Sequence, residues 1–129
     1  MSDRTGSLSL SDLVWGFIKL TRERWPDATF PIWYSRVWDE FFYDLKRKLG
    51  PEFQEVEPAI GFVEWDGPGP HIPDLRDLLR TAHAHEKLWT NEHGRMYPTR
   101  PLAHGLPPSL FEEMLKIARE HEGLLANVT

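Results

Sequence analysis

Residues 73–99 read PDLRDLLRTAHAHEKLWTNEHGRMYPT, and the patterns in this stretch decide the fold. Apolar residues recur at the spacing of one helical face, at Leu75, Leu78, Leu79 and Ala82. Because proline suits the first helical position, we predict a helix from about Pro73 to His83. Beyond it, the turn-forming residues Asn91–Gly94 separate two arms, Lys87–Thr90 and Arg95–Thr99, which predicts a hairpin. Pro98 should keep the second arm at a sheet edge, since proline has no N–H to donate.

Two further helices are expected before this stretch. Ser9 and Asp12 form a capping-box pattern that predicts the start of the first helix. Trp25-Pro26 should end that helix, because the residue before a proline resists the helical conformation. The second helix is expected to start at residue 29 or 31 and to stop at Gly50, with a broad apolar face along its length.

The remaining segments complete an α+β pattern. Residues 59–65 predict a short strand covered on both faces, and residues 66–70 predict a turn. A last helix is expected over residues 108–122, with Gly123 as its C-terminal cap. The chain should therefore be mostly helical, with about four helices and a small antiparallel sheet. The order of strand, helix and hairpin between flanking helices is winged-helix-like.

The composition indicates a folded protein. Of the 129 residues, 40% are hydrophobic and 27% are charged, which is typical of a globular domain. We therefore expect a single globular domain over residues 1–129, with a short flexible tail at residues 1–7. The lack of cysteine excludes disulfides and thiolate metal sites. Because charges break every apolar stretch and the N-terminus does not resemble a signal peptide, we expect a cytoplasmic location and no membrane partner.

Three short motifs resemble the Panacea-type antitoxin domain. They are the run Phe62–Pro68, the leucine pattern of the 73–83 helix, and the run Arg95–Thr99. The resemblance extends from Thr29 to Thr99. The serine that commonly follows the family's Gly-Pro is absent, and His71-Ile72-Pro73 follows here. The resemblance implies a non-enzymatic domain that binds and neutralises a partner protein.

Several aromatic side chains fall outside the apolar stripes of their predicted helices. At about 100° per residue, Trp15 lies on the polar side of the first helix, close to Arg22. Exposed aromatic rings beside arginine are typical of protein interfaces. An alternative is that another element of the same domain covers these rings. The candidate partner-binding residues are Trp15, Arg22, Trp33 and Tyr43, and the partner would be either a different protein or a second copy of this chain.

A basic stripe on the 73–83 helix raises a second possibility, DNA binding. In a winged-helix protein such a helix enters the major groove, and the hairpin contacts phosphates. The candidate nucleic-acid contacts are Arg76, Arg80, His83 and Arg95. Because two aspartates share the helix and the net charge of the chain is −5, we expect weak or no DNA binding.

The histidines of residues 83–93 suggest a third possibility, a small metal-dependent enzyme that uses His83, His85 and His93. His85-Glu86 opens like a zinc-protease helix motif, but Trp89 stands where that motif requires its second histidine. His83 and His85 would also point about 200° apart on a continuous helix. We therefore expect no metal, no cofactor and no catalytic residue. A regulatory or protein-binding role is the favoured function.

Overall fold

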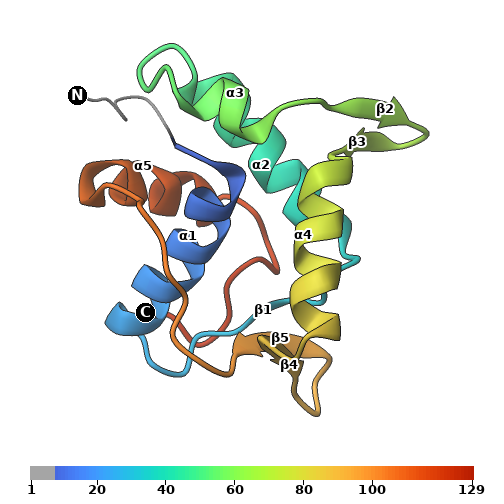
Figure 1. Cartoon of the computed structure of the whole chain (residues 1–129), viewed down its shortest axis with the longest axis vertical. Helices are drawn as coiled ribbons and strands as arrows, with labels where there is room; N and C mark the ends of the chain where they lie inside the picture. The colour runs from blue at the N-terminus through green and yellow to red at the C-terminus, as the bar shows by residue number, and fades with distance from the viewer. Residues whose placement is uncertain (1–7) are drawn as a thin grey trace.

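The computed structural model describes residues 8–129, and the flexible tail predicted at residues 1–7 lies outside them. The described chain folds into five helices and two small antiparallel sheets (Figure 1). This confirms the α+β fold class, with one helix more than expected. The helices are α1 (Leu10–Arg24), α2 (Arg36–Leu49), α3 (Val56–Ile60), α4 (Pro73–Ala84) and α5 (Pro108–Ala118).

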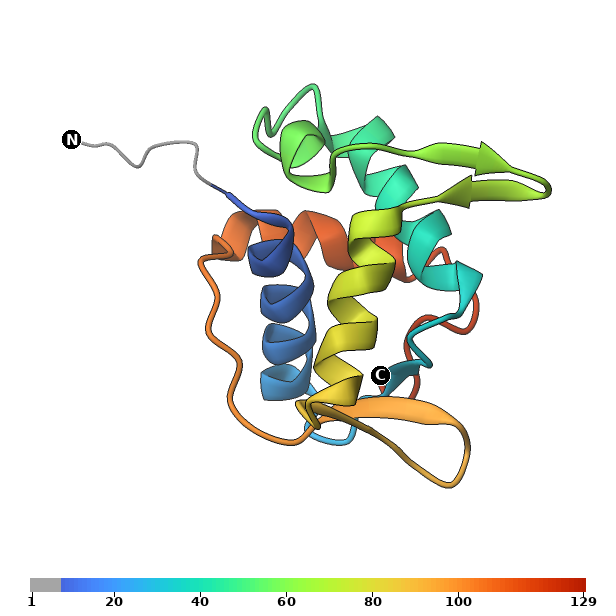
Figure 2. The ribbon, with the colours of Figure 1, turned by 45° about the vertical axis from the view of Figure 1, so that its right-hand side comes forward.

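The strands form a three-stranded sheet in the order β1-β5-β4 and a separate hairpin of β2 and β3. The three-stranded sheet lies at one end of the molecule, and the β2–β3 hairpin projects from the opposite end (Figures 1 and 2). The strands are β1 (Phe30–Pro31), β2 (Glu64–Asp66), β3 (Gly69–His71), β4 (Leu88–Thr90) and β5 (Arg95–Pro98).

The order of elements is winged-helix-like, although its first strand differs from the one predicted. The helices α1, α2 and α4 precede the β4–β5 hairpin, and β1 joins that hairpin by pairing Phe30 with Met96 and Pro31 with Arg95. The predicted strand at residues 59–65 takes no part in this sheet. β1 has only two residues, and the strand with which it pairs lies far along the chain. So short a strand shows no recognisable strand pattern in its own sequence.

The second helix starts later than predicted, because Phe30 and Pro31 belong to β1 and not to a helix. Residues 29–31 were expected to open it, but α2 begins at Arg36. Its N-terminal cap is Ser35, whose hydroxyl accepts a hydrogen bond from the Val37 N–H at 3.3 Å. The indole of Trp38 donates to the Pro31 carbonyl at 2.9 Å, which fixes the chain between β1 and α2.

The segment predicted as one strand divides between a helix and a hairpin. The helix α3 ends at Ile60, inside the predicted strand, and β2 begins at Glu64. Pro58 is compatible with α3 because it lies in the first turn, where a helix needs no N–H bond. Pairing of Asp66 with Gly69 leaves only Gly67 and Pro68 as the turn, shorter than the predicted turn at residues 66–70. Gly67 has a φ of 69°, which a side chain would make unfavourable.

The expectation that this segment is covered on both faces was also wrong. Phe62 and Trp65 are 65% and 64% exposed. Trp65 belongs to β2, and the β2–β3 hairpin extends beyond the helices (Figure 2). These two rings are therefore available for contacts outside the described chain.

Two smaller predictions also need correction. β5 is the central strand and not an edge strand. Pro98 is tolerated there because β1 pairs only with Arg95 and Met96 and ends before it. α5 ends at Ala118, short of the predicted residue 122, because the chain then turns to bring Ala126 into pairing with Thr29.

The capping box predicted at the start of α1 is confirmed. The Asp12 N–H donates to the Ser9 hydroxyl at 3.1 Å, and the Ser9 N–H donates to the Asp12 carboxylate at 3.0 Å. The Gly105 N–H also donates to this carboxylate at 2.7 Å, which holds the chain before α5 against α1. Burial raises the pKa of Asp12, but the hydrogen bonds from Ser9 and Gly105 outweigh it and keep that pKa below its ordinary value.

The core is formed by residues from all five helices and from the inner face of the three-stranded sheet. Phe17 is at its centre, with ring centroids 5.0 Å from Phe41, 6.1 Å from Phe30 and 6.2 Å from Phe111. All four rings are at most 3% exposed. Burial of aromatic side chains of this size supplies much of the hydrophobic stabilisation of a small domain.

Replacing Gly16 with alanine is expected to destabilise the domain. At an exposed helix position, alanine would add about 1 kcal/mol of stability. Here a Cβ would lie 2.8 Å from Leu106 Cδ2 and 2.9 Å from His104 Nδ1, which is closer than such atoms can pack. The resulting displacement should cost about 1–3 kcal/mol. Urea unfolding of Gly16→Ala measures this loss, and a gain in stability would contradict the close packing of residues 104–106 on α1.

Candidate functional site

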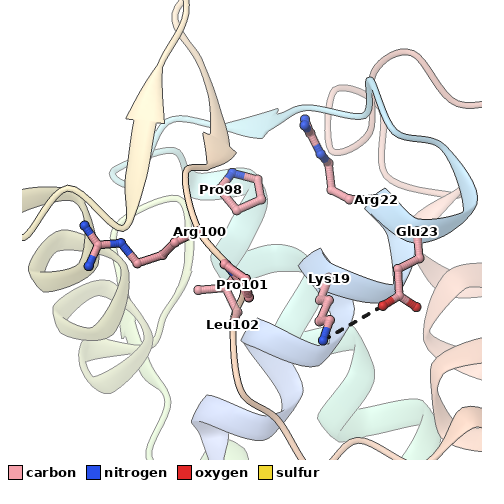
Figure 3. Close-up of a pocket in the computed structure, with 7 residues that line it drawn as sticks. All are labelled: Lys19, Arg22, Glu23, Pro98, Arg100, Pro101 and Leu102. Carbon is pink, nitrogen blue, oxygen red and sulfur yellow. Dashed lines mark ion pairs between the residues drawn. The ribbon is translucent and has the colours of Figure 1, made fainter.

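Two adjoining hollows form a groove between α1 and the chain that leaves β5. Their volumes are about 190 and 410 Å³, and both are lined by Arg22, Pro98 and Arg100. Figure 3 shows the smaller hollow, with side chains of α1 on one side and those of residues 98–102 on the other. We call this surface the α1–β5 groove. Its lining residues are Lys19, Arg22, Glu23, Glu86, Trp89 and residues 97–102.

The far wall of the groove is an irregular segment that prolines keep out of the sheet. Pro98 ends β5, and Pro101 follows where no strand continues. The backbone N–H of Thr99 donates to the Lys87 carbonyl at 3.0 Å, and its hydroxyl donates to the Glu86 carbonyl at 2.6 Å. These two bonds fix the segment against the end of α4. The wall of the groove is therefore formed by the chain before any ligand arrives.

The floor of the larger hollow is aromatic. Trp89 and Tyr97 are directly opposite in the β4–β5 pairing, so their side chains emerge on the same face of the sheet. Their neighbours Leu88 and Met96 point the other way and are fully buried. Trp89 remains 50% exposed. The sheet thus presents an aromatic pair to the groove while its other face completes the core.

Charged side chains form the rim of the groove. The Arg22 guanidinium lies 6.0 Å from the centre of the Tyr97 ring and donates to the Ala28 carbonyl at 2.7 Å. Lys19 and Glu23 form a loose, half-exposed ion pair at 3.9 Å, the dashed contact in Figure 3. Arg100 is exposed and points away from α1. The groove therefore combines apolar walls with a polar rim, as the core and rim of a protein interface do.

Glu86 occupies an unusual backbone conformation at the edge of the groove. α4 ends in a Schellman motif, in which the Lys87 N–H donates to the Ala82 carbonyl and the Glu86 N–H donates to the His83 carbonyl. The residue at the left-handed position of this motif is usually glycine, but here it is Glu86, with a φ of 62°. Its side chain lines the larger hollow. A charged side chain is thus held at the groove despite a conformation that glycine would favour.

The structure places the candidate partner-binding residues on two different surfaces. Arg22 lines the groove, and Trp15 lies one turn before Lys19 on the same side of α1. Tyr43 lies elsewhere, with its ring 5.2 Å from that of Trp65 on the β2–β3 hairpin. Trp33 packs edge-on against Tyr34 before α2. Trp15 and Trp33 are both partly buried, because each also packs against the core.

Two of the four candidate nucleic-acid contacts are engaged inside the chain. Arg76 pairs with the buried Asp39 at 2.6 Å. Arg95 donates to the carbonyls of Thr29, Gly123 and Leu124, so it joins β5 to β1 and to the C-terminal chain. Burial lowers the pKa of the Arg95 guanidinium from its ordinary value. Neither guanidinium is free to approach a phosphate without giving up these bonds.

The other two candidate contacts lie on exposed or half-exposed parts of the surface. Arg80 is exposed and pairs with Asp77, three residues earlier, at 3.0 Å. His83 lies 3.1 Å from the Thr90 hydroxyl, which links α4 to β4. Only Arg80 therefore remains as a largely exposed cation among the four, and a carboxylate already accompanies it.

The histidines singled out in the sequence do not converge. His85 is exposed at the end of α4, and His93 is exposed in the β4–β5 turn, 3.8 Å from Glu92. Within residues 8–129, no group of three or more histidine, aspartate and glutamate side chains is arranged to hold a metal ion.

None of the helices in residues 8–129 is long and apolar enough to cross a membrane.

Of the residues that line the groove, sequence reasoning selected only Arg22 and missed the others, among them Trp89, Tyr97 and Arg100. The hairpin itself was predicted, and its alternation holds a usable signal, since Leu88 is buried and Trp89 must then face outward. The approach of α1 and residues 98–102 to that outer face is a long-range contact that no local pattern reveals.

Comparison of the chain with protein families, with curated proteins and with solved structures found no match to any of them.

Proposed function

We propose that this chain is a non-enzymatic regulatory domain that binds a partner protein through the α1–β5 groove. The proposal rests on one observation, the gathering of Trp89, Tyr97 and Arg22 along a single preformed concave surface. Tryptophan, tyrosine and arginine are the residues that most often dominate the binding energy of protein interfaces. Trp15 continues this surface along α1 by its helical spacing from Lys19.

The shape of the groove suits an extended segment of the partner. The smaller hollow has room for one apolar side chain against Pro98, Pro101 and Leu102. The larger hollow would take the next part of the segment over the Trp89 and Tyr97 rings. Lys19, Glu23 and Arg100 at the rim would pair with polar groups that flank the segment. Because the wall is already fixed by hydrogen bonds, binding would cost little ordering of this chain.

The resemblance to the Panacea-type antitoxin domain suggests the consequence of such binding. One of the three similar motifs, Arg95–Thr99, contributes Tyr97, Pro98 and Thr99 to the groove. A partner held there by an antitoxin-like domain would be a toxic protein whose activity binding blocks. Co-expression of the chain with the partner would then restore growth to cells that the partner alone inhibits.

Photocrosslinking inside the cell tests the proposed function. A photoreactive amino acid is placed at residue 100, in the groove, and in a second variant at residue 54, an exposed position beside α3 at the other end of the molecule. We expect one crosslinked protein from residue 100 and none, or a different weak set, from residue 54. Identical products from both positions, or no product from residue 100, would contradict the proposal.

A further inference from the structure

The wall of the α1–β5 groove formed by residues 98–102 offers few backbone donors to a partner. Pro98 and Pro101 have no N–H, and the Thr99 N–H already donates to the Lys87 carbonyl at 3.0 Å. A strand that adds to another chain needs alternating N–H and carbonyl groups along its edge. A partner segment is therefore not held in the groove as an additional strand paired with this wall.

The floor of the larger hollow carries hydrogen-bond donors on side chains. Trp89 and Tyr97 line this hollow, and within residues 8–129 no group forms a hydrogen bond with the Trp89 indole N–H or with the Tyr97 hydroxyl. The Arg22 guanidinium lies over the Tyr97 ring, and its one hydrogen bond to residues 8–129 runs from Nη1 to the Ala28 carbonyl at 2.7 Å. Indole and guanidinium groups donate but do not accept. The hollow therefore suits a partner chain that brings acceptors and few donors.

The charges around the larger hollow are mainly positive. Its lining includes two arginines, Arg22 and Arg100, and one carboxylate, that of Glu86. Neither arginine forms an ion pair within residues 8–129. Lys19 and Glu23 of the adjoining hollow already pair with each other at 3.9 Å. A partner segment with an acidic group therefore complements this surface better than a basic one does.

We propose that the α1–β5 groove binds a proline-rich segment that carries an acidic residue, an inference that rests on the function proposed for this groove. Proline has no N–H, so such a segment buries no unsatisfied donor against the apolar walls. Its carbonyls accept hydrogen bonds from Trp89 and Tyr97, and its rings lie on the aromatic side chains. Grooves lined by aromatic side chains are the sites at which proline-rich segments dock.

The polyproline II conformation of such a segment fits the two adjoining hollows. This left-handed helix has no internal hydrogen bonds, and residues three apart face the same side, about 9 Å from each other. One proline then enters the smaller hollow against Pro98, Pro101 and Leu102 (Figure 3), while another lies over the Trp89 ring. Because the segment is extended before it binds and Thr99 fixes the wall, little conformational freedom is lost on binding.

The test uses an acetylated, amidated hexaproline with one glutamate added at each end, titrated into the isotope-labelled full chain at low ionic strength. The control is the same peptide with serine in place of every proline, since it has the same charge but retains its N–H groups. We expect the proline peptide to shift the NMR signals of the Trp89 indole and of the Tyr97, Thr99 and Arg100 amides, and to bind about tenfold more tightly than the control. Equal binding of the two peptides, or no shift of these signals, would overturn the proposal.

A pair of tryptophan variants tests the indole donor. Trp89→Phe keeps an aromatic ring but removes the N–H, and should weaken binding of the proline peptide about fivefold, the effect of one lost hydrogen bond. Trp65→Phe makes the same change at an exposed ring outside the groove and should bind within about twofold of the unchanged chain. Because both positions are exposed, both variants should remain folded, which circular dichroism checks. Equal affinities of the two variants would contradict the proposed role of Trp89.

A pair of arginine variants separates the groove from the overall charge. Arg100→Gln and Arg80→Gln each remove one positive charge at an exposed position, but only Arg100 lines the groove. Arg100→Gln should weaken binding about threefold, as the loss of an exposed ion pair does, and Arg80→Gln should weaken it less. Equal affinities of these variants would show that the acidic residue has no place in the proposal.

Crosslinking from residue 100 distinguishes a failure of this inference from a failure of the proposed function. If the proline peptide does not bind while residue 100 still crosslinks one partner, the groove remains a protein-binding site and the proline-rich occupant is wrong. If the crosslinked partner is absent as well, the function proposed for the groove also fails.

Discussion

Replacing Asp39 with alanine is expected to lower the free energy of unfolding by about 3–5 kcal/mol, a large part of the stability of a domain of this size. Asp39 lies on α2 and is 0% exposed. Its carboxylate accepts hydrogen bonds from the Ile72 N–H at 2.9 Å and from the Arg76 guanidinium at 2.6 Å. It therefore holds the start of α4 against α2.

The expected effect is large because alanine would leave two buried polar groups without a partner. The Arg76 side chain is only 23% exposed, and Ile72 is fully buried. Without Asp39, a mostly buried cation and a buried N–H would both lose their partner, and each would retain its desolvation cost.

Asp77→Ala provides the control for this experiment. Asp77 also pairs with an arginine of α4, but its side chain is 68% exposed and that of Arg80 is 57% exposed. Such a pair contributes about 0–1 kcal/mol. Urea unfolding followed by tryptophan fluorescence compares the two variants. A loss for Asp39→Ala no greater than that for Asp77→Ala would show that the buried pair does not hold α4 in place.

The second large effect is expected on binding. Trp89→Ala should weaken the complex with the partner identified by crosslinking about 30-fold or more, since truncation of such an interface residue typically costs at least about 2 kcal/mol. The stability of the chain should fall by less than about 1 kcal/mol, because half of the Trp89 surface is exposed and the ring lies outside the core. Binding and folding should therefore respond separately.

Tyr34→Ala is the matched control for Trp89→Ala. Tyr34 is an aromatic residue of similar exposure, 59% against 50%, and lies before α2 and outside the groove. Calorimetric titration should give the same affinity for Tyr34→Ala as for the unchanged chain. Equal losses of affinity in the two variants would mean that an exposed aromatic ring contributes to binding wherever it lies on the surface. The groove would then not be the binding site.

The parts of the fold that the sequence predicts are those with local signals. The capping box at Ser9, the proline at the start of α4 and the turn at residues 91–94 each lie within the element that they define. By contrast, β1 consists of two residues whose pairing partners lie beyond α4. Periodicity in a short window cannot reveal such a strand, and the same window made residues 29–31 part of a helix.

The candidate site, like the fold, could be predicted only where its signals are local. Arg22 and Trp15 could be selected because helical phase places them outside the apolar stripe of α1. The other side of the groove depends on how residues 98–102 pass over the sheet, and prolines there indicate only that regular structure ends. Arg76 and Arg95 appeared to be surface cations, because their internal partners Asp39 and Leu124 come from distant segments.

NMR mapping of the bound chain tests the groove most directly. Backbone amide shifts of the isotope-labelled chain are recorded while the crosslinked partner is added. The account predicts that the largest changes fall at Lys19, Arg22 and residues 86–102, and that they disappear in Trp89→Ala at the same partner concentration. Large changes confined to α5 or to the β2–β3 hairpin, with the groove signals unmoved, would contradict it.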